Sequence, residues 1–214
     1  MIALDAVTLT VRENQAQRAL LDRASFRFTP GIWHIAADPP GDARHLVQFL
    51  ATCREPAAHG IRCDGPRSWP LAQFAPFGPY LTGIDIIDAM SSLYALERRG
   101  TVRLFQYLID DADWLLARFD RWPPVLQRQF GHIAFLAPAF ENYFLDISPI
   151  FPDDAFQRRW QPLFHERIAG KTVIIASGQH RATLRDFPGQ TLALSGATLR
   201  GTGATVPPPA LAAE

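Results

Sequence analysis

Three short apolar runs constrain the fold of this chain most strongly. Residues 32–37, 142–146 and 171–177 are short and largely apolar, and the last is rich in β-branched residues. Runs of this kind are typical of strands buried on both faces of a sheet. Helical spacing of apolar residues separates them, at residues 43–52, 126–137 and 154–168. Strands that alternate with helices predict an α/β fold in which helices cover the faces of a sheet.

The remaining segments fill in this plan. Residues 2–11 and 24–28 predict strands of an opening sheet, and residues 191–194 and 197–200 predict a closing hairpin around Ser195-Gly196. Proline and glycine predict loops at 38–42 and 66–83. Apolar spacing predicts helices at 84–99 and 102–119, so residues 84–138 form an inserted helical lobe. We therefore expect one domain at 1–201 and a mobile tail at 202–214.

Composition excludes several classes of protein. Basic and acidic residues number 21 each, so net charge gives no case for binding nucleic acid or an anionic membrane. Cys53 and Cys63 lack metal-ligand spacing and are too few for a disulfide scaffold. The apolar runs are too short for a transmembrane span, and no signal peptide is recognisable, so we expect a cytoplasmic protein. Lys171 is the single lysine, so any chemistry that needs a lysine depends on it.

Three short motifs occur in a characteristic order. They are Ser68-Trp69-Pro70-Leu71, then Leu81-Thr82-Gly83, then Leu93-Tyr94-Ala95-Leu96. With this order of parts, residues 1–201 resemble the ATP-binding subunit of ABC transporters, and in particular the capsular or cell-surface polysaccharide exporters. The resemblance implies a P-loop NTPase-like nucleotide-binding domain with an inserted helical subdomain at about 84–138.

The phosphate-binding loop departs from the pattern that this resemblance implies. A Walker A loop needs glycines, a lysine on the phosphates and a hydroxyl on magnesium. The matching positions here are Gly41, Asp42, Ala43, Arg44 and His45. Ala43 takes the lysine position and Arg44 the magnesium-hydroxyl position, while prolines 39 and 40 remove N–H donors. The sequence therefore predicts a degenerate loop that is closed to phosphate.

The other motif positions are degenerate as well. The Q-loop glutamine position is Gly78, the signature stretch at 123–127 has no glycine, and the switch histidine position is Gly178. Ile147 replaces the catalytic glutamate and cannot polarise a water molecule. Asp153 matches the D-loop aspartate. Asp146 matches the magnesium-side aspartate of the Walker B strand and binds a metal only if nucleotide binds, although an aspartate at a strand end can equally be a loop or cap residue.

An apolar segment matches the surface through which the family contacts its membrane subunit. It contains Phe74, Phe77, Tyr80, Leu81 and Ile84. These side chains form either an exposed patch that binds a permease helix or the packing of an irregular loop.

Three functions remain open. The first is a catalytically degenerate, ATP-binding-subunit-like partner of a polysaccharide-export permease, peripheral at the inner face of the cytoplasmic membrane, as a homodimer or paired with an active subunit. It expects no cofactor. The second is a working ATPase that uses Mg-ATP for capsular polysaccharide export, and the third is a repurposed soluble binding module without a transporter partner. A fold alone does not decide among them.

Overall fold

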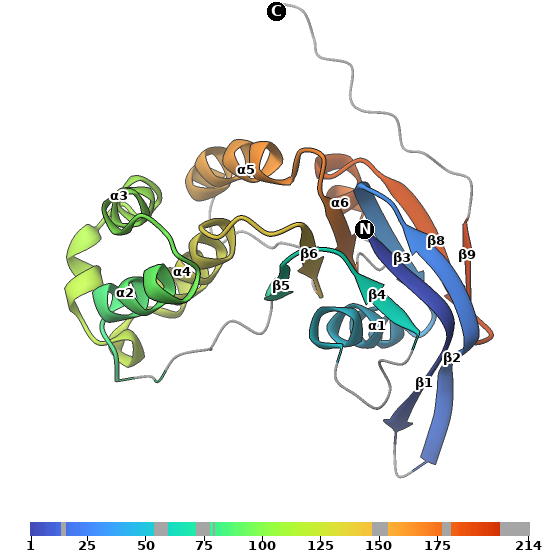
Figure 1. The fold of residues 1–214 in the computed structure, drawn as a ribbon. Helices are drawn as coiled ribbons and strands as arrows, with labels where there is room; N and C mark the ends of the chain where they lie inside the picture. The colour runs from blue at the N-terminus through green and yellow to red at the C-terminus, as the bar shows by residue number, and fades with distance from the viewer. Residues whose placement is uncertain are drawn as a thin grey trace, which may run out of the picture. The chain divides into compact units, whose positions relative to one another are not determined.

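A computed structural model describes residues 1–13, 16–53, 60–71, 78, 80–146, 154–176 and 181–201. Its contacts divide the chain into two units (Figure 1). The first unit comprises Met1–Ala72, Phe140–Pro149 and Gly170–Glu214, and the second comprises Gln73–Ala139 and Ile150–Ala169. The predicted tail at 202–214 lies outside the described residues.

The first unit contains two sheets. The three-stranded antiparallel sheet has the order β2-β1-β4, formed by β1 (Ile2–Glu13), β2 (Ala16–Phe28) and β4 (Ile61–Cys63). The six-stranded sheet has the order β5-β6-β7-β3-β8-β9. Its strands are β3 (Gly31–Ala37), β5 (Arg67–Pro70), β6 (Asn142–Leu145), β7 (Thr172–Ile175), β8 (Gln190–Ser195) and β9 (Thr198–Gly201). All its neighbours pair in parallel except the β8–β9 hairpin.

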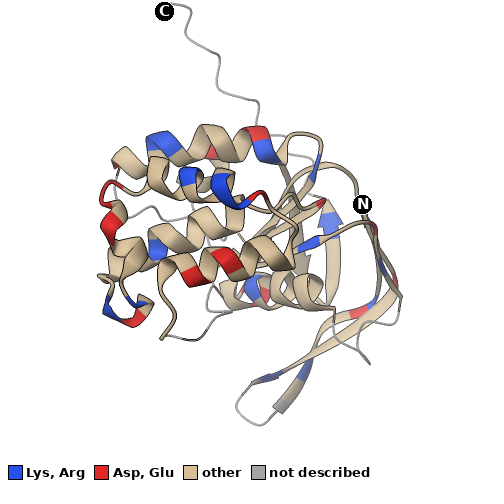
Figure 2. Cartoon of the chain, turned by 60° about the vertical axis from the view of Figure 1, so that its left-hand side comes forward, with Lys and Arg blue, Asp and Glu red and all other residues tan. Residues whose placement is uncertain are grey.

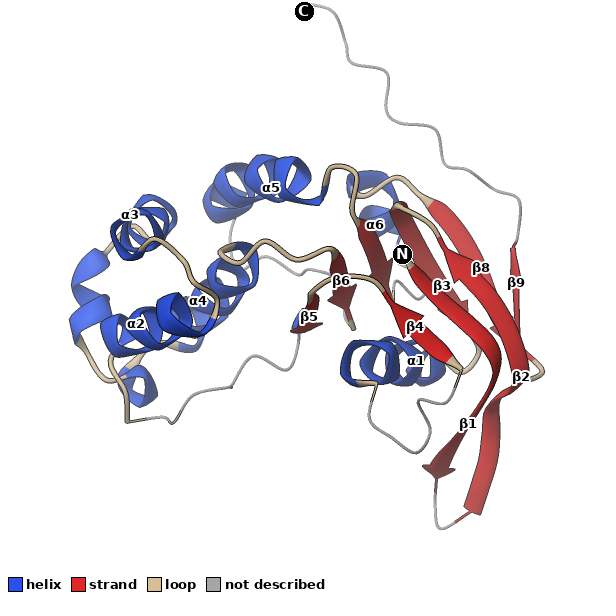
Figure 3. Ribbon diagram, in the orientation of Figure 1, coloured by secondary structure: helices blue, strands red, loops and turns tan. Residues whose placement is uncertain are grey.

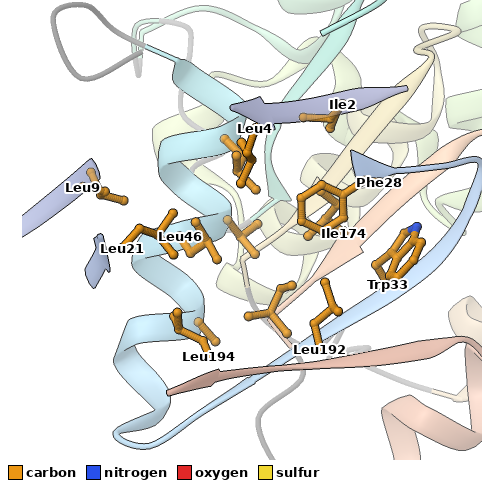
Figure 4. Close-up of a cluster of buried hydrophobic side chains, with 14 of the residues drawn as sticks. Ile2, Leu4, Leu9, Leu21, Phe28, Trp33, Leu46, Ile174, Leu192 and Leu194 are labelled. Atoms are coloured by element: carbon orange, nitrogen blue, oxygen red, sulfur yellow. The ribbon is translucent and has the colours of Figure 1, made fainter. Parts of the chain in front are cut away.

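Helix α1 (Pro40–Thr52) joins the core of this unit. Leu46, Val47 and Leu50 of α1 are completely buried and share one hydrophobic cluster with side chains from both sheets. Figure 4 shows Leu46 among these side chains, with Phe28 and Trp33 nearby. Because the sheets and α1 bury the same apolar cluster, the start of α1 is held against the ends of the parallel strands. A short helix, α6 (Arg181–Asp186), also belongs to this unit.

The second unit is helical in its described part (Figure 3). It contains α2 (Gly83–Leu93), α3 (Arg98–Leu108), α4 (Pro124–Leu136) and α5 (Asp154–Ile168), with 3-10 turns η2 (Ala112–Leu116) and η3 (Phe119–Arg121). The rings of Phe105, Phe119, Trp122 and Phe130 pack together around α4. The unit also includes α5, which lies outside the 84–138 lobe expected from the sequence.

Most expected elements are confirmed, and several boundaries were wrong. The predicted loop at 38–42 is shorter, because α1 begins at Pro40. The predicted helix at 84–99 ends at Leu93, where Tyr94 caps it and Ala95 takes a positive φ of 52°. The predicted helix at 102–119 ends at Leu108 and gives way to 3-10 turns. Residues 16–23, β4, most of β5 and α6 were not predicted as regular structure from composition or spacing.

Charges of both signs are distributed over the chain. Figure 2 shows Lys and Arg interleaved with Asp and Glu along the helices and strands. The equal totals of basic and acidic residues are thus also mixed locally. Individual pairs of opposite charges therefore determine the local electrostatic potential.

Candidate functional site: the start of helix α1

The loop between β3 and α1 provides few backbone donors. Pro39 is the N-cap with φ −70° and ψ 154°, and no side chain caps the helix. Proline at the first helical position suits a helix start, because an N–H there would have no partner within the helix. The N–H of Asp42 donates to the carbonyl of Pro39 at 3.1 Å. The prolines have no N–H to offer, and the Asp42 N–H is bonded within the chain.

A carboxylate of the chain itself lies in the first turn of α1. Asp42 is buried, and Arg18 of β2 donates from both terminal nitrogens to its two carboxylate oxygens, with Nη1 at 2.7 Å from Oδ2. Paired N–H donors of this kind give strong, oriented contacts. A negative charge in the first turn also interacts favourably with the helix dipole. Sequence reasoning identified Asp42 but missed Arg18, which lies 24 residues earlier and has no motif around it.

Arg44 and Gln48 lie one turn apart on α1 and reach the end of β6. Gln48 Nε2 donates to Asp146 Oδ2 at 2.8 Å, and Arg44 Nε lies 3.7 Å from the same oxygen. The Asp146 side chain has no exposed surface, whereas that of Arg44 is 52% exposed. The structure therefore brings together the positions that resemblance assigned to the magnesium hydroxyl and the Walker B aspartate. Gln48 was missed, and its spacing of four from Arg44 was the signal available.

The remaining loop positions differ in burial. The Ala43 methyl group is completely buried in the core of the first unit. Gly41 and His45 are exposed, and a Cβ added at Gly41 would contact nothing within 4 Å. Glycine is thus not needed at position 41 for a close approach within this chain.

The other predicted motif positions fall in different places. Gly78 is exposed, and its carbonyl accepts from Leu81 N–H at 3.3 Å. At the signature position, Pro123 caps α4, and the Gln127 amide donates to the carbonyls of Phe119 and Trp122, each at 3.1 Å. Ile147, Asp153 and Gly178 lie outside the described residues.

The candidate partner surface is described only in part. Phe74 and Phe77 lie outside the described residues. Tyr80 is 72% exposed, Leu81 is 36% exposed and Ile84 is half-buried. The guanidinium of Arg118 lies 4.8 Å from the centroid of the Tyr80 ring, in a cation–π contact. Thr82 pairs with Arg118, and Phe119 N–H donates to the Leu81 carbonyl at 2.8 Å, so backbone bonds hold Leu81 and Thr82 against the 118–119 turn.

The described residues contain no group of three His, Cys, Asp or Glu side chains that could hold a metal ion. Nor does any described helix have the length and apolar character to cross a membrane. Cys53 and Cys63 are free, and burial raises the pKa of both thiols. Burial therefore keeps both thiols in the unreactive protonated form.

Comparison with known proteins confirms the resemblance found in the sequence. No protein-family model matches the chain. It is 21% identical over 184 residues to the capsule polysaccharide export ATP-binding protein CtrD of Neisseria meningitidis serogroup B, with 85% of each chain covered. It is 20% identical over 179 residues to the ATP-binding protein BexA of Haemophilus influenzae, covering 83% of this chain and 82% of BexA.

A solved structure identifies the fold. A dimeric ATP-binding cassette in a post-hydrolysis state, bound to ADP and Pi, superposes with a TM-score of 0.68 at 13% identity. The match covers 94% of this chain and 97% of that one. The predicted fold class is confirmed: the chain has the α/β fold of ABC ATP-binding domains, and its relatives in sequence include a capsule polysaccharide export ATP-binding protein and a second ATP-binding protein.

Proposed function

We propose that this chain is a non-catalytic, ATP-binding-subunit-like component of a capsule-type polysaccharide exporter. In this role it binds a membrane permease at the cytoplasmic face of the membrane and acts as a structural or regulatory subunit. The similarity to CtrD, whose name includes capsule polysaccharide export, supports the exporter assignment. The observation that carries the loss of ATP chemistry is the set of internal charges at the start of α1.

Those charges do not suit Mg-ATP. The Asp42 carboxylate lies in the first turn of the helix, where a phosphate group of the nucleotide would need positive potential. No lysine is available, because the only one, Lys171, forms an ion pair with Glu141 at 2.6 Å. Losing one charge-assisted hydrogen bond costs about 1.5–3 kcal/mol, and several are replaced here at once.

The names of the relatives favour a second function. Both contain the words ATP-binding protein, so a working ATPase that uses Mg-ATP for polysaccharide export is the alternative. Binding of Mg-ATP separates the two functions.

Either function requires a second chain. ABC dimers place nucleotide between one chain's Walker A loop and the other's signature stretch, and this chain is degenerate at both positions. A homodimer would therefore be inactive, and a heterodimer with an active subunit would have impaired sites. We propose that this chain acts by binding the permease and that nucleotide chemistry is not its role.

The partner surface can be tested with matched tyrosines. Tyr80 and Tyr107 are both exposed residues of the helical unit, but only Tyr80 lies in the proposed permease contact. Truncating a central aromatic of an interface costs about 2 kcal/mol, which is about 30-fold in affinity. We expect Tyr80→Ala to reduce co-purification with a co-expressed permease of the exporter by about 30-fold, with an unchanged melting temperature. Tyr107→Ala should co-purify normally.

The opposite pattern would remove this surface from the account. If Tyr80→Ala binds the permease as well as the unaltered chain does, the contact lies elsewhere. If Tyr80→Ala and Tyr107→Ala weaken binding equally, the effect is not specific to the proposed surface.

A further inference from the structure

The Asp146 carboxylate is an acid in a place from which water is excluded. Its side chain has no exposed surface and lies at the end of β6, the strand next to β7 in the centre of the larger sheet. An ionised carboxylate at such a place is costly unless a cation and hydrogen-bond donors compensate its charge. Both kinds of compensation come from α1: Gln48 donates a hydrogen bond to Asp146, and Arg44 supplies a positive charge 3.7 Å away.

Arg44 and Gln48 lie where the resemblance would place a metal ion. The sequence resemblance assigns Arg44 to the hydroxyl that binds magnesium and Asp146 to the aspartate on the metal side. Magnesium requires oxygen ligands in near-octahedral geometry at about 2.0–2.1 Å. Here Gln48 donates to Asp146 Oδ2, and the Arg44 guanidinium lies 3.7 Å from the same oxygen. A positively charged donor in place of a hydroxyl repels a divalent cation.

We infer that Arg44 is a built-in cation that compensates Asp146 permanently and takes the place of magnesium. The core of the first unit is then neutral at this point without any metal. The inference rests on the proposed loss of ATP chemistry, and it adds a stabilising role for the residue that replaced the metal-binding hydroxyl. It also predicts that the acid and the arginine depend on each other.

A thermal double-mutant cycle tests this dependence without nucleotide. Arg44→Met removes the charge and keeps an apolar stem, and Asp146→Asn removes the acid and keeps the shape. We expect Arg44→Met to lower the melting temperature by about 5 °C, because it leaves a buried carboxylate without its cation. In the Asp146→Asn background the same substitution should lower it by less than half as much. Arg62→Met, at an exposed arginine of β4, is the matched control and should leave the melting temperature unchanged.

Magnesium provides the second readout. Magnesium chloride should not raise the melting temperature of the unaltered chain above that in sodium chloride of equal ionic strength. Equal effects of Arg44→Met in both backgrounds, or stabilisation of the unaltered chain by magnesium, would overturn the inference.

The two proposals fail separately. If the unaltered chain binds Mg-ATP while the cycle still shows coupling, the proposed function is wrong and the Arg44–Asp146 dependence stands. If the chain ignores Mg-ATP but the cycle is additive, the function survives and this inference is wrong.

Discussion

Among the described residues, His34 and His132 are the buried histidines, and burial lowers the pKa of both. His34 lies in β3, and its Nε2 donates to the Phe187 carbonyl at 2.7 Å, which leaves Nδ1 as an acceptor without a partner among the described residues. His132 donates from Nδ1 to the Arg128 carbonyl at 2.8 Å. Each ring is thus held in the neutral form, and protonation would place a charge among apolar side chains.

This arrangement predicts that stability falls as the medium becomes acidic. In the unfolded chain a histidine binds its proton below pH about 6.5, whereas in the folded chain the lowered pKa delays protonation. The unfolded state therefore binds more protons in this window. The free energy of unfolding should be constant above the unfolded pKa and decrease as pH falls from there toward the folded pKa. Urea unfolding at a series of pH values measures this slope.

Matched histidine variants show which residue causes the slope. His34→Gln keeps a donor for the Phe187 carbonyl but does not titrate, so it should reduce the slope and leave the part that His132 contributes. His45→Gln, at an exposed position, should leave it unaltered. If both variants keep the full slope, His34 does not contribute and its assignment as a neutral buried group is wrong.

At the scale of elements, a capping box determines where helix α2 begins. The Thr82 hydroxyl accepts from Asp85 N–H at 3.2 Å, and the Asp85 carboxylate accepts from Thr82 N–H at 2.9 Å. This reciprocal capping box satisfies two donors at the start of α2. The hydrogen bonds to Thr82 lower the pKa of Asp85, so the box persists at neutral pH.

Removing the cap hydroxyl should destabilise the chain measurably. We expect Thr82→Ala to cost about 1 kcal/mol, or about 2–4 °C in melting temperature. Thr82→Ser keeps the acceptor and should retain most of the stability. Thr52→Ala, at the exposed end of α1, removes a hydroxyl that bonds only to preceding helix carbonyls, so it should be close to neutral. Equal losses in Thr82→Ala and Thr82→Ser would show that the hydroxyl does not act as a cap.

Sequence patterns predicted three elements with nearly correct boundaries. β3, β7 and α5 match their expected ranges closely, because an apolar pattern runs along the full length of each: a continuous run in the strands and a helical period in α5. The break at Leu108 was missed because apolar spacing continues through Leu115 and Leu116, whereas the Asp111 side chain caps a 3-10 turn at Asp113 N–H. The start of β2 is polar, and its pairing with β1 gives it a regular structure.

The candidate site shows the same division. Asp42, Arg44 and Asp146 could be identified by their positions relative to a known pattern. Arg18 could not, because a contact between a strand residue and a helix residue leaves no local spacing in the sequence, and Gln48 was marked only by its spacing of four from Arg44. Tertiary structure thus supplied the partners of charges that the sequence had already located.

At the scale of the molecule, the chain keeps the layers of an ABC ATP-binding domain and compensates its buried charges internally. Arg18 pairs with Asp42 in the first turn of α1, and Arg44 lies beside Asp146 at the end of β6, so each of these acids has a cation of the same unit beside it. Both relatives are named ATP-binding proteins, and the proposed function departs from those names only because this chain is proposed not to bind nucleotide. Nucleotide binding is therefore the property on which the account depends.

Thermal unfolding of the unaltered chain in Mg-ATP tests this claim most directly. A ligand present at 100 times its Kd stabilises a folded protein by about 2.7 kcal/mol, or about 5–10 °C for a chain of this size. Magnesium chloride alone and ATP alone are the controls. The account predicts the same melting temperature in all three solutions at millimolar nucleotide. A rise of several degrees that requires Mg-ATP and saturates below millimolar concentration would contradict it.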